Sequence, residues 1–128
     1  MLNLLYNEAF KENNMPFIET KTSVKLDESK INALKEAYGK DIEIIPGKTE
    51  SWLMLNFVGD CKMAFRGKTE PDTAILEVSI LGTATKDAYD KLTYKLCEDV
   101  SAILGVPSDR IYIKYSEHTV WGYDKENF

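Results

Sequence analysis

The stretch Gly105-Val106-Pro107-Ser108-Asp109-Arg110-Ile111-Tyr112-Ile113-Lys114-Tyr115 decides the fold, because one predicted element ends in it and another begins. Residues 85–104, which precede it, carry apolar side chains at the three-and-four spacing of an amphipathic helix. Gly105 and Pro107 are residues that typically end a helix. The alternation over 110–115 predicts a strand, and another strand is predicted over 73–81. The second half of the chain is therefore predicted to be a strand, a helix and a strand.

The first half of the chain repeats this plan. Residues 17–23 contain enough β-branched side chains for a strand. Residues 27–45 have a helical spacing of apolar side chains that a Pro-Gly pair ends, and residues 52–58 are apolar enough for a buried strand. Gly47 and Gly105 lie 58 residues apart, which indicates an internal repeat.

This repeat predicts an α+β fold of two layers. A tandem βαβ pseudo-repeat forms a four-stranded sheet with both helices on one face. The other face is expected to be rich in apolar side chains and therefore to be covered by another subunit. Aromatic residues between Trp121 and Phe128 are expected to add to this interface.

Composition excludes several classes of protein. With 128 residues, of which 44% are hydrophobic and 29% charged, the chain is expected to form a globular domain with a core. A net charge of -5 disfavours a nucleic-acid partner, and no apolar run approaches the about 20 residues of a membrane helix. We expect neither a nucleic acid nor a membrane as partner. A cytoplasmic location is expected, with release by a non-classical route as an alternative.

The residues that usually carry metal or nucleophilic chemistry are scarce. Cys61 and Cys97 are too far apart for a metal motif or a redox pair, and His118 is the only histidine. Triads that depend on histidine and most zinc sites are therefore not expected. We predict no cofactor and no metal, so an enzyme with this sequence needs another kind of base.

Met15-Pro16-Phe17-Ile18 has the form of a second start within the chain. Proline after an initiating methionine becomes a free secondary amine when that methionine is removed, and such an amine can act as a base. The sequence is therefore divided into an N-terminal extension, residues 1–15, and a domain, residues 16–128. The extension is expected to be a translated leader or a mis-assigned start. The alternative is a genuine arm, helical over residues 4–11, that packs on the domain or on a neighbour.

Over residues 16–128 the sequence resembles the macrophage migration inhibitory factor family of the tautomerase superfamily. Two runs carry this resemblance most specifically, Met63-Ala64-Phe65-Arg66-Gly67 and Asp109-Arg110-Ile111-Tyr112-Ile113, and their order and spacing with Met15-Pro16 match the family. Further matching positions are Gly47-Lys48, Glu70-Pro71, Ser79-Ile80, Leu96-Cys97 and Gly122-Tyr123.

The resemblance implies a homotrimer with active sites at the subunit boundaries and keto–enol tautomerisation of an aryl α-keto acid such as phenylpyruvate. By motif match, Pro16 corresponds to the catalytic base and Lys48 to the cation that holds the substrate carboxylate. Ile80 takes the position of a backbone amide donor to the same carboxylate, and Tyr112 that of a tyrosine from the neighbouring subunit. The positions that correspond to the pocket wall are Phe17, Trp52, Tyr123 and Phe128.

Other readings of the site stay open. Lys114 stands where vertebrate members of the family carry Asn, and its charge either strengthens anion binding or crowds the pocket. If residues 1–15 are retained, the nitrogen of Pro16 is an amide and cannot be a base. One alternative function is a signalling or host-interaction protein with a vestigial pocket. Another is decarboxylation or dehalogenation of a small acid, for which neither Arg66 nor Arg110 occupies a matching position.

Overall fold

The computed structural model describes residues 15–128, and the expectation of a helical arm over residues 4–11 lies outside them. The described chain forms, in order, β1 (Pro16–Thr22), α2 (Glu28–Asp41), the 3-10 helices η1 (Ile42–Ile44) and η2 (Glu50–Trp52), β2 (Met54–Val58), β3 (Ala74–Leu81), α3 (Lys86–Leu104), the 3-10 helix η3 (Ser108–Arg110), β4 (Ile111–His118), β5 (Gly122–Tyr123) and β6 (Glu126–Asn127).

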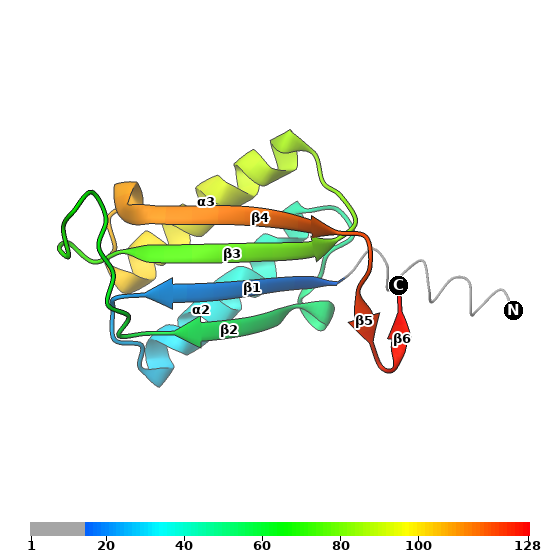
Figure 1. Ribbon diagram of the computed structural model, residues 1–128, viewed down its shortest axis with the longest axis horizontal. Helices are drawn as coiled ribbons and strands as arrows, with labels where there is room; N and C mark the ends of the chain where they lie inside the picture. The colour runs from blue at the N-terminus through cyan, green and yellow to red at the C-terminus, as the bar shows by residue number, and fades with distance from the viewer. Residues whose placement is uncertain (1–14) are drawn as a thin grey trace, which may run out of the picture.

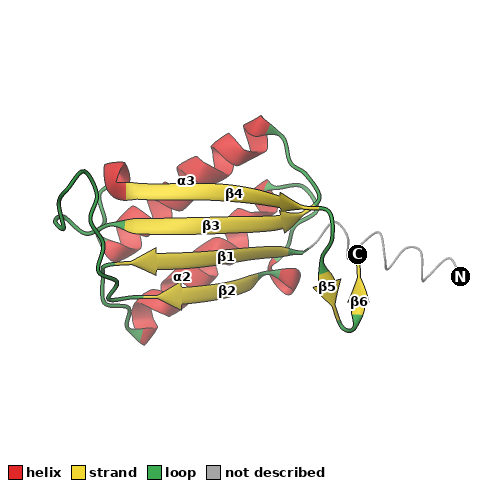
Figure 2. Ribbon diagram, viewed as in Figure 1, coloured by secondary structure: helices red, strands yellow, loops and turns green. Residues whose placement is uncertain are grey.

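Four strands form one mixed sheet in the order β2-β1-β3-β4, with α2 and α3 on the same face (Figure 1 and Figure 2). β1 is parallel to β2 and β3 is parallel to β4, while β1 and β3 are antiparallel at the centre. Each parallel pair is connected through one long helix. The predicted tandem βαβ units in two layers are therefore confirmed.

Residues with specific backbone roles fix the ends of both helices. Asp27 Oδ1 accepts a hydrogen bond from the Lys30 N–H at 2.8 Å, and Thr85 Oγ1 accepts one from the Ala88 N–H at 3.1 Å. Gly105 ends α3 with a φ of 75°, a left-handed conformation that glycine adopts without steric cost. The helix boundaries therefore follow from local sequence.

The core lies between the sheet and the two helices. Every second side chain of β1 and β3 is buried against the helices. The largest fully buried side chains include Tyr38, Ile18, Leu34, Ile42, Leu76, Ile80, Leu92 and Leu96. Across residues 15–128, no helix has both the length and the apolar composition that crossing a membrane requires.

Two elements of the first half differ from their predicted forms. The helix predicted to continue to Ile45 ends at Asp41, and Ile45 is extended, with a ψ of 117°. The following Pro46 explains this end, because its ring disfavours a helical conformation of the preceding residue. The prediction of a buried strand over 52–58 was also wrong. β2 begins at Met54 and lies at the edge of the sheet, and none of its residues is buried.

The apolar run from Met63 to Phe65 lies in a loop and not in a strand. Phe65 makes only an isolated bridge with Lys68. The loop is held instead by the buried side chain of Arg110, which donates hydrogen bonds to the Phe65 carbonyl at 3.2 Å, the Lys68 carbonyl at 3.0 Å and Thr73 Oγ1 at 2.8 Å. Arg110 therefore has a structural role.

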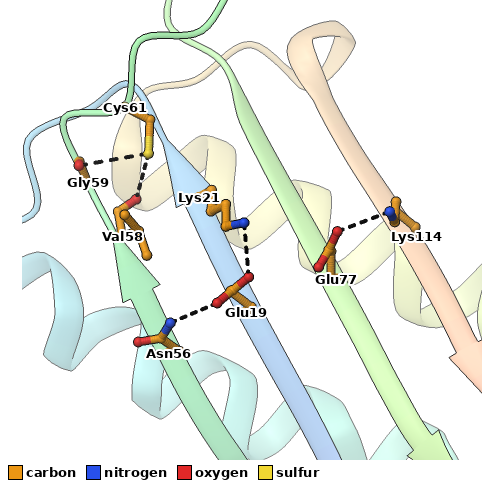
Figure 3. A network of polar contacts seen from close by, with 8 residues as sticks. All are labelled: Glu19, Lys21, Asn56, Val58, Gly59, Cys61, Glu77 and Lys114. Carbon is orange, nitrogen blue, oxygen red and sulfur yellow. Dashed lines mark hydrogen bonds and ion pairs between the residues drawn. The ribbon is translucent and has the colours of Figure 1, made fainter.

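The face of the sheet opposite the helices is mixed, with polar side chains at its centre and apolar side chains such as Phe17, Ile75 and Tyr112 toward its ends, so the predicted apolar face is found only in part. Asn56 donates a hydrogen bond to Glu19 at 2.8 Å, and Lys21 forms an ion pair with the same carboxylate at 3.3 Å (Figure 3). On the neighbouring strands, Lys114 pairs with Glu77 at 3.0 Å (Figure 3). The polar centre of this face does not have to be covered to remove apolar surface from water. Glu19, Lys21 and Glu77 are polar positions that alternate with buried residues along β1 and β3.

Exposed apolar side chains occur at the two edges of the sheet, and also at Tyr94 on α3 and at Val120 and Tyr123 near the C-terminus. Met54 is 68% exposed and Val58 38% exposed on β2, and Tyr112 is 59% exposed on β4. Among residues 15–128, each edge strand also has a row of backbone groups without a strand neighbour. These edges are the parts of the fold best suited to contact another copy.

Candidate functional site

A pocket of about 860 Å³ lies where β1 begins and the β5–β6 hairpin approaches the open face of the sheet. Its walls combine apolar and aromatic side chains with a few polar groups, a composition typical of small-molecule sites. The lining residues are Met15, Pro16, Phe17, Ser51, Trp52, Leu53, Met54, Ser79, His118, Val120, Trp121, Gly122 and Tyr123.

Pro16 lies at this pocket because it is the first residue of a central strand. It lies opposite Ile80 in the antiparallel β1–β3 pair. Met15 continues the pairing, since its carbonyl accepts a hydrogen bond from the Leu81 N–H at 3.0 Å, and Met15 is only 3% exposed. In this chain the nitrogen of Pro16 is therefore part of a peptide bond and has no lone pair available for a proton.

Lys48 is a buried cation connected to the same point of the sheet. Only 4% exposed, it donates a hydrogen bond from Nζ to the Leu81 carbonyl at 2.9 Å. Burial lowers the pKa of Lys48. Among residues 15–128 no carboxylate forms an ion pair with it, so an anion would gain by binding nearby.

Leu81 connects Lys48 with the start of β1. Its N–H bonds to Met15 and its carbonyl to Lys48, so one peptide segment contacts both groups. Lys48 and Ile80 are not among the residues that line the pocket. Ile80 belongs to the core beneath the helices, and Lys48 contacts the end of β3 through the Leu81 carbonyl.

The aromatic wall is formed by η2 and the C-terminal hairpin. The rings of Trp52 and Tyr123 pack edge to face, with centroids 5.1 Å apart. The hairpin turns at two residues with positive φ, Asp124 at 48° and Lys125 at 71°, which is the pattern of a two-residue hairpin turn. Phe128 does not line the pocket, and its N–H bonds to the Trp121 carbonyl at 2.8 Å, which closes the hairpin.

Tyr112 and Lys114 lie away from this pocket. Tyr112 is opposite Ile75 on β3, whereas Pro16 is opposite Ile80. The five intervening steps of β3 correspond to about 17 Å. Tyr112 packs on the Phe65 ring with centroids 5.1 Å apart. One copy of the chain therefore does not bring all of the predicted site residues together.

Sequence reasoning did not assign His118, Trp121 or Ser79 to the site, although all three line the pocket. Ser116 donates a hydrogen bond to Ser79 at 3.0 Å and contacts His118 Nε2 at 3.1 Å, and the rings of His118 and Trp121 pack edge to face with centroids 5.6 Å apart. The feature that could have assigned His118 to the site is the length of β4. Once this strand continues to His118, alternation places residues 112, 114, 116 and 118 on the open face.

The described residues do not offer a metal site. No group of three or more His, Cys, Asp or Glu side chains within residues 15–128 is arranged to hold a metal ion. The chemistry of the pocket rests on its aromatic wall, its hydroxyl and imidazole groups and the buried cation behind it.

Comparison with known proteins places the chain in one family. The profile of the family Macrophage migration inhibitory factor (MIF) matches residues 15–125. The structure of MIF2 from Leishmania major is 30% identical with a TM-score of 0.84, covering 90% of this chain and 98% of that one. A homologue of macrophage migration inhibitory factor from Prochlorococcus marinus is 28% identical with a TM-score of 0.78, covering 88% and 98%.

The fold is also shared with a macrophage migration inhibitory factor-like protein from Entamoeba histolytica, at 22% identity and a TM-score of 0.78, covering 89% of this chain and 99% of that one. No curated protein matches the sequence. Because the family profile spans nearly all described residues and the fold agrees throughout, the chain belongs to the macrophage migration inhibitory factor family and has the fold of the tautomerase superfamily.

Proposed function

We propose that the protein is a keto–enol tautomerase of aryl α-keto acids of the phenylpyruvate type, with the nitrogen of Pro16 as the general base once residues 1–15 are absent. The observation that carries this proposal is that Pro16 lines an aromatic pocket close to a buried cation. The carbonyl of Met15, the residue before Pro16, accepts a hydrogen bond from Leu81, and the carbonyl of Leu81 accepts one from the buried Lys48. Family membership supports the reaction class.

The base requires a free amine with a depressed pKa. An alkyl ammonium is normally protonated at neutral pH, so it must lose its proton to act as a base. Two features of the site favour the neutral amine of Pro16. The apolar wall disfavours any charge, and the cation of Lys48 disfavours a second positive charge nearby.

The substrate carboxylate is proposed to occupy the place of the Met15 carbonyl. When residues 1–15 are absent, the Leu81 N–H loses its acceptor and is available to an anion. Lys48 contributes positive charge next to the same residue, because its ammonium group bonds to the Leu81 carbonyl. The register thus favours the amide of Leu81 as the donor, next to Ile80, for which the family resemblance implies this role.

The reaction then needs only proton transfers. In the keto-to-enol direction, the Pro16 nitrogen takes a proton from the carbon next to the carbonyl group, and the ammonium that results gives this proton to the carbonyl oxygen as the enol forms. The aromatic ring of the substrate would pack on Trp52 and Tyr123. Proton number is conserved and no electron is exchanged, so the proposed reaction needs no oxidant or reductant.

We also propose a homotrimer in which a neighbouring subunit completes the site. Tyr112 and Lys114 are exposed on β4 and far from their own pocket, so a second copy is needed to bring them to it. The apolar side chains at the sheet edges, Met54, Val58 and Tyr112, supply contact area for such an assembly. Closed cyclic symmetry satisfies both edges of each subunit at once.

The length of the chain should determine activity. A form that begins at Pro16 is expected to tautomerise phenylpyruvate, because its terminal nitrogen is an amine. The form with all 128 residues should be slower by about 10²–10⁴-fold, the usual contribution of a general base. The measurement is the ratio of kcat/KM between the two forms, after mass spectrometry has verified both termini.

A matched control for this comparison is Pro16→Gly in the short form. It keeps a terminal amine but changes its basicity and position, so its rate should fall between those of the two forms. Equal rates for the short and long forms would show that Pro16 is not the base.

Removing the charge of Lys48 should weaken substrate binding. Lys48→Met in the short form keeps the buried apolar stem but loses a charge-assisted hydrogen bond, which corresponds to an increase in KM for phenylpyruvate of about ten- to hundredfold. Steady-state kinetics measures this change. The control is Lys35→Met, which removes the same charge from an exposed position. If KM is the same in both variants, Lys48 does not hold the carboxylate.

The assembly should be visible in solution. Light scattering of the short form is expected to give three times the mass of one chain, because the site is shared between copies. A stable monomer at micromolar concentration, close to the 14.6 kDa of the 128-residue chain, would overturn the trimer.

A further inference from the structure

A pair of acidic side chains lies between the two long helices, apart from the pocket at Pro16. Asp41 is the last residue of α2 and is 4% exposed, and the side chain of Asp99 on α3 is 16% exposed. Both line a cleft of about 320 Å³ between the helices, together with Glu36, Lys40 and Lys95. Ionised carboxylates are rarely buried at this level without a partner.

Each carboxyl group has one oxygen without a hydrogen-bond partner. Asp41 Oδ2 and Asp99 Oδ2 are buried, and no donor within residues 15–128 reaches either atom. Ionised carboxylates only accept hydrogen bonds, so two of them cannot satisfy one another. A single proton between them would turn one oxygen into a donor and satisfy both groups.

The charges around the pair are unequal. Lys95 forms an ion pair with Asp99 Oδ1 at 3.2 Å, whereas among the described residues Asp41 has no ion pair. This difference places the shared proton on Asp41. The other titratable groups that face the pair are Glu98 on α3, which contacts Lys95 at 3.3 Å, Tyr38 on α2, and Glu36 and Lys40 on α2, which pair with each other at 3.4 Å.

The protonation equilibrium agrees with this arrangement. Burial raises the pKa of Asp41 far above the ordinary carboxyl range, and a hydrogen bond with Asp99 and its negative charge raise it further, against the opposing charge of Lys95. The hydroxyl of Tyr38 lies 2.8 Å from Thr20 Oγ1 and does not reach either of the unpaired carboxyl oxygens.

We propose that Asp41 and Asp99 share one proton across the interface between α2 and α3, and that loss of this proton at alkaline pH weakens the packing of the two helices. The folded state binds this proton and the unfolded state releases it above about pH 4, the ordinary carboxyl value. The stability that the pair provides is therefore complete below that pH. It decreases as the pH rises through the raised pKa of Asp41.

The test compares thermal unfolding of the full chain and of Asp41→Asn at about pH 5.5 and about pH 9. Asn keeps the shape of the side chain and donates a hydrogen bond to Asp99 at every pH. The Tm of the variant, taken relative to that of the natural chain, should be higher by about 5 °C or more at the higher pH than at the lower pH, because only the natural chain loses the shared proton. Asp87→Asn, which removes an exposed charge from α3, should leave the difference between the two pH values unchanged.

Asp99→Asn provides a second variant, because it leaves Asp41 with an amide donor instead of a carboxylate. It should also reduce the dependence of Tm on pH, although it loses the contact with Lys95. A Tm of Asp41→Asn that differs from that of the natural chain by the same amount at both pH values would overturn the proposal, since it would make Asp41 an ionised structural residue. A Tm that rises at about pH 9 on addition of Ca²⁺ or Mg²⁺ and falls with EDTA would also overturn it, since the pair would then bind a cation instead of a proton.

Discussion

The antiparallel pairing of β1 with β3 is the contact on which the rest of the structure depends. It joins the two βαβ units into one sheet, and it buries alternate residues of both strands beneath the helices. The same ladder extends one step beyond β1, where the Met15 carbonyl accepts the Leu81 N–H. A pairing that organises the core thus also determines which backbone groups surround Pro16. Fold and site share this constraint, because the first residue of a central strand cannot move without the sheet.

The two faces of the sheet differ, because one is buried beneath the helices and the other carries polar side chains at its centre. Lys48 reaches the Leu81 carbonyl at the end of β3 and is almost fully buried there, although its charge makes burial unfavourable. A buried charge of this kind is typical of functional sites, which supports the proposal that an anion binds at the pocket. The open face carries its own ion pairs, Glu19 with Lys21 and Glu77 with Lys114, so the proposed assembly rests on the apolar side chains at the sheet edges.

The sequence predicts the elements well where local rules act alone. The cap at Thr85, the left-handed Gly105 and the repeated order of strand and helix are local features, and each is found where it was expected. One feature was missed because it depends on the whole sheet. The edge position of β2 follows from strand order, which no window of sequence contains. The polar centre of the open face, in contrast, follows from the alternation of Glu19, Lys21 and Glu77 with buried residues within β1 and β3.

The candidate site could likewise be predicted from the sequence only in part. Pro16, Phe17, Trp52 and Tyr123 line one pocket, and their roles in a reaction stay predictions. The place of His118 in the pocket was missed because it needed the length of β4. Tyr112 and Lys114 lie away from the pocket in one copy of the chain, so their predicted roles rest on the proposed trimer. The pair of Asp41 and Asp99 has no sequence signal either, since the two residues meet only when α2 packs on α3.

The central claim is that the nitrogen of Pro16 is a free secondary amine in the working protein. Intact mass and N-terminal sequencing of the protein isolated from its own cells test this claim most directly. The account predicts a chain that begins at Pro16, without residues 1–15. A chain that retains Met15 or any earlier residue while catalysing the reaction would contradict it.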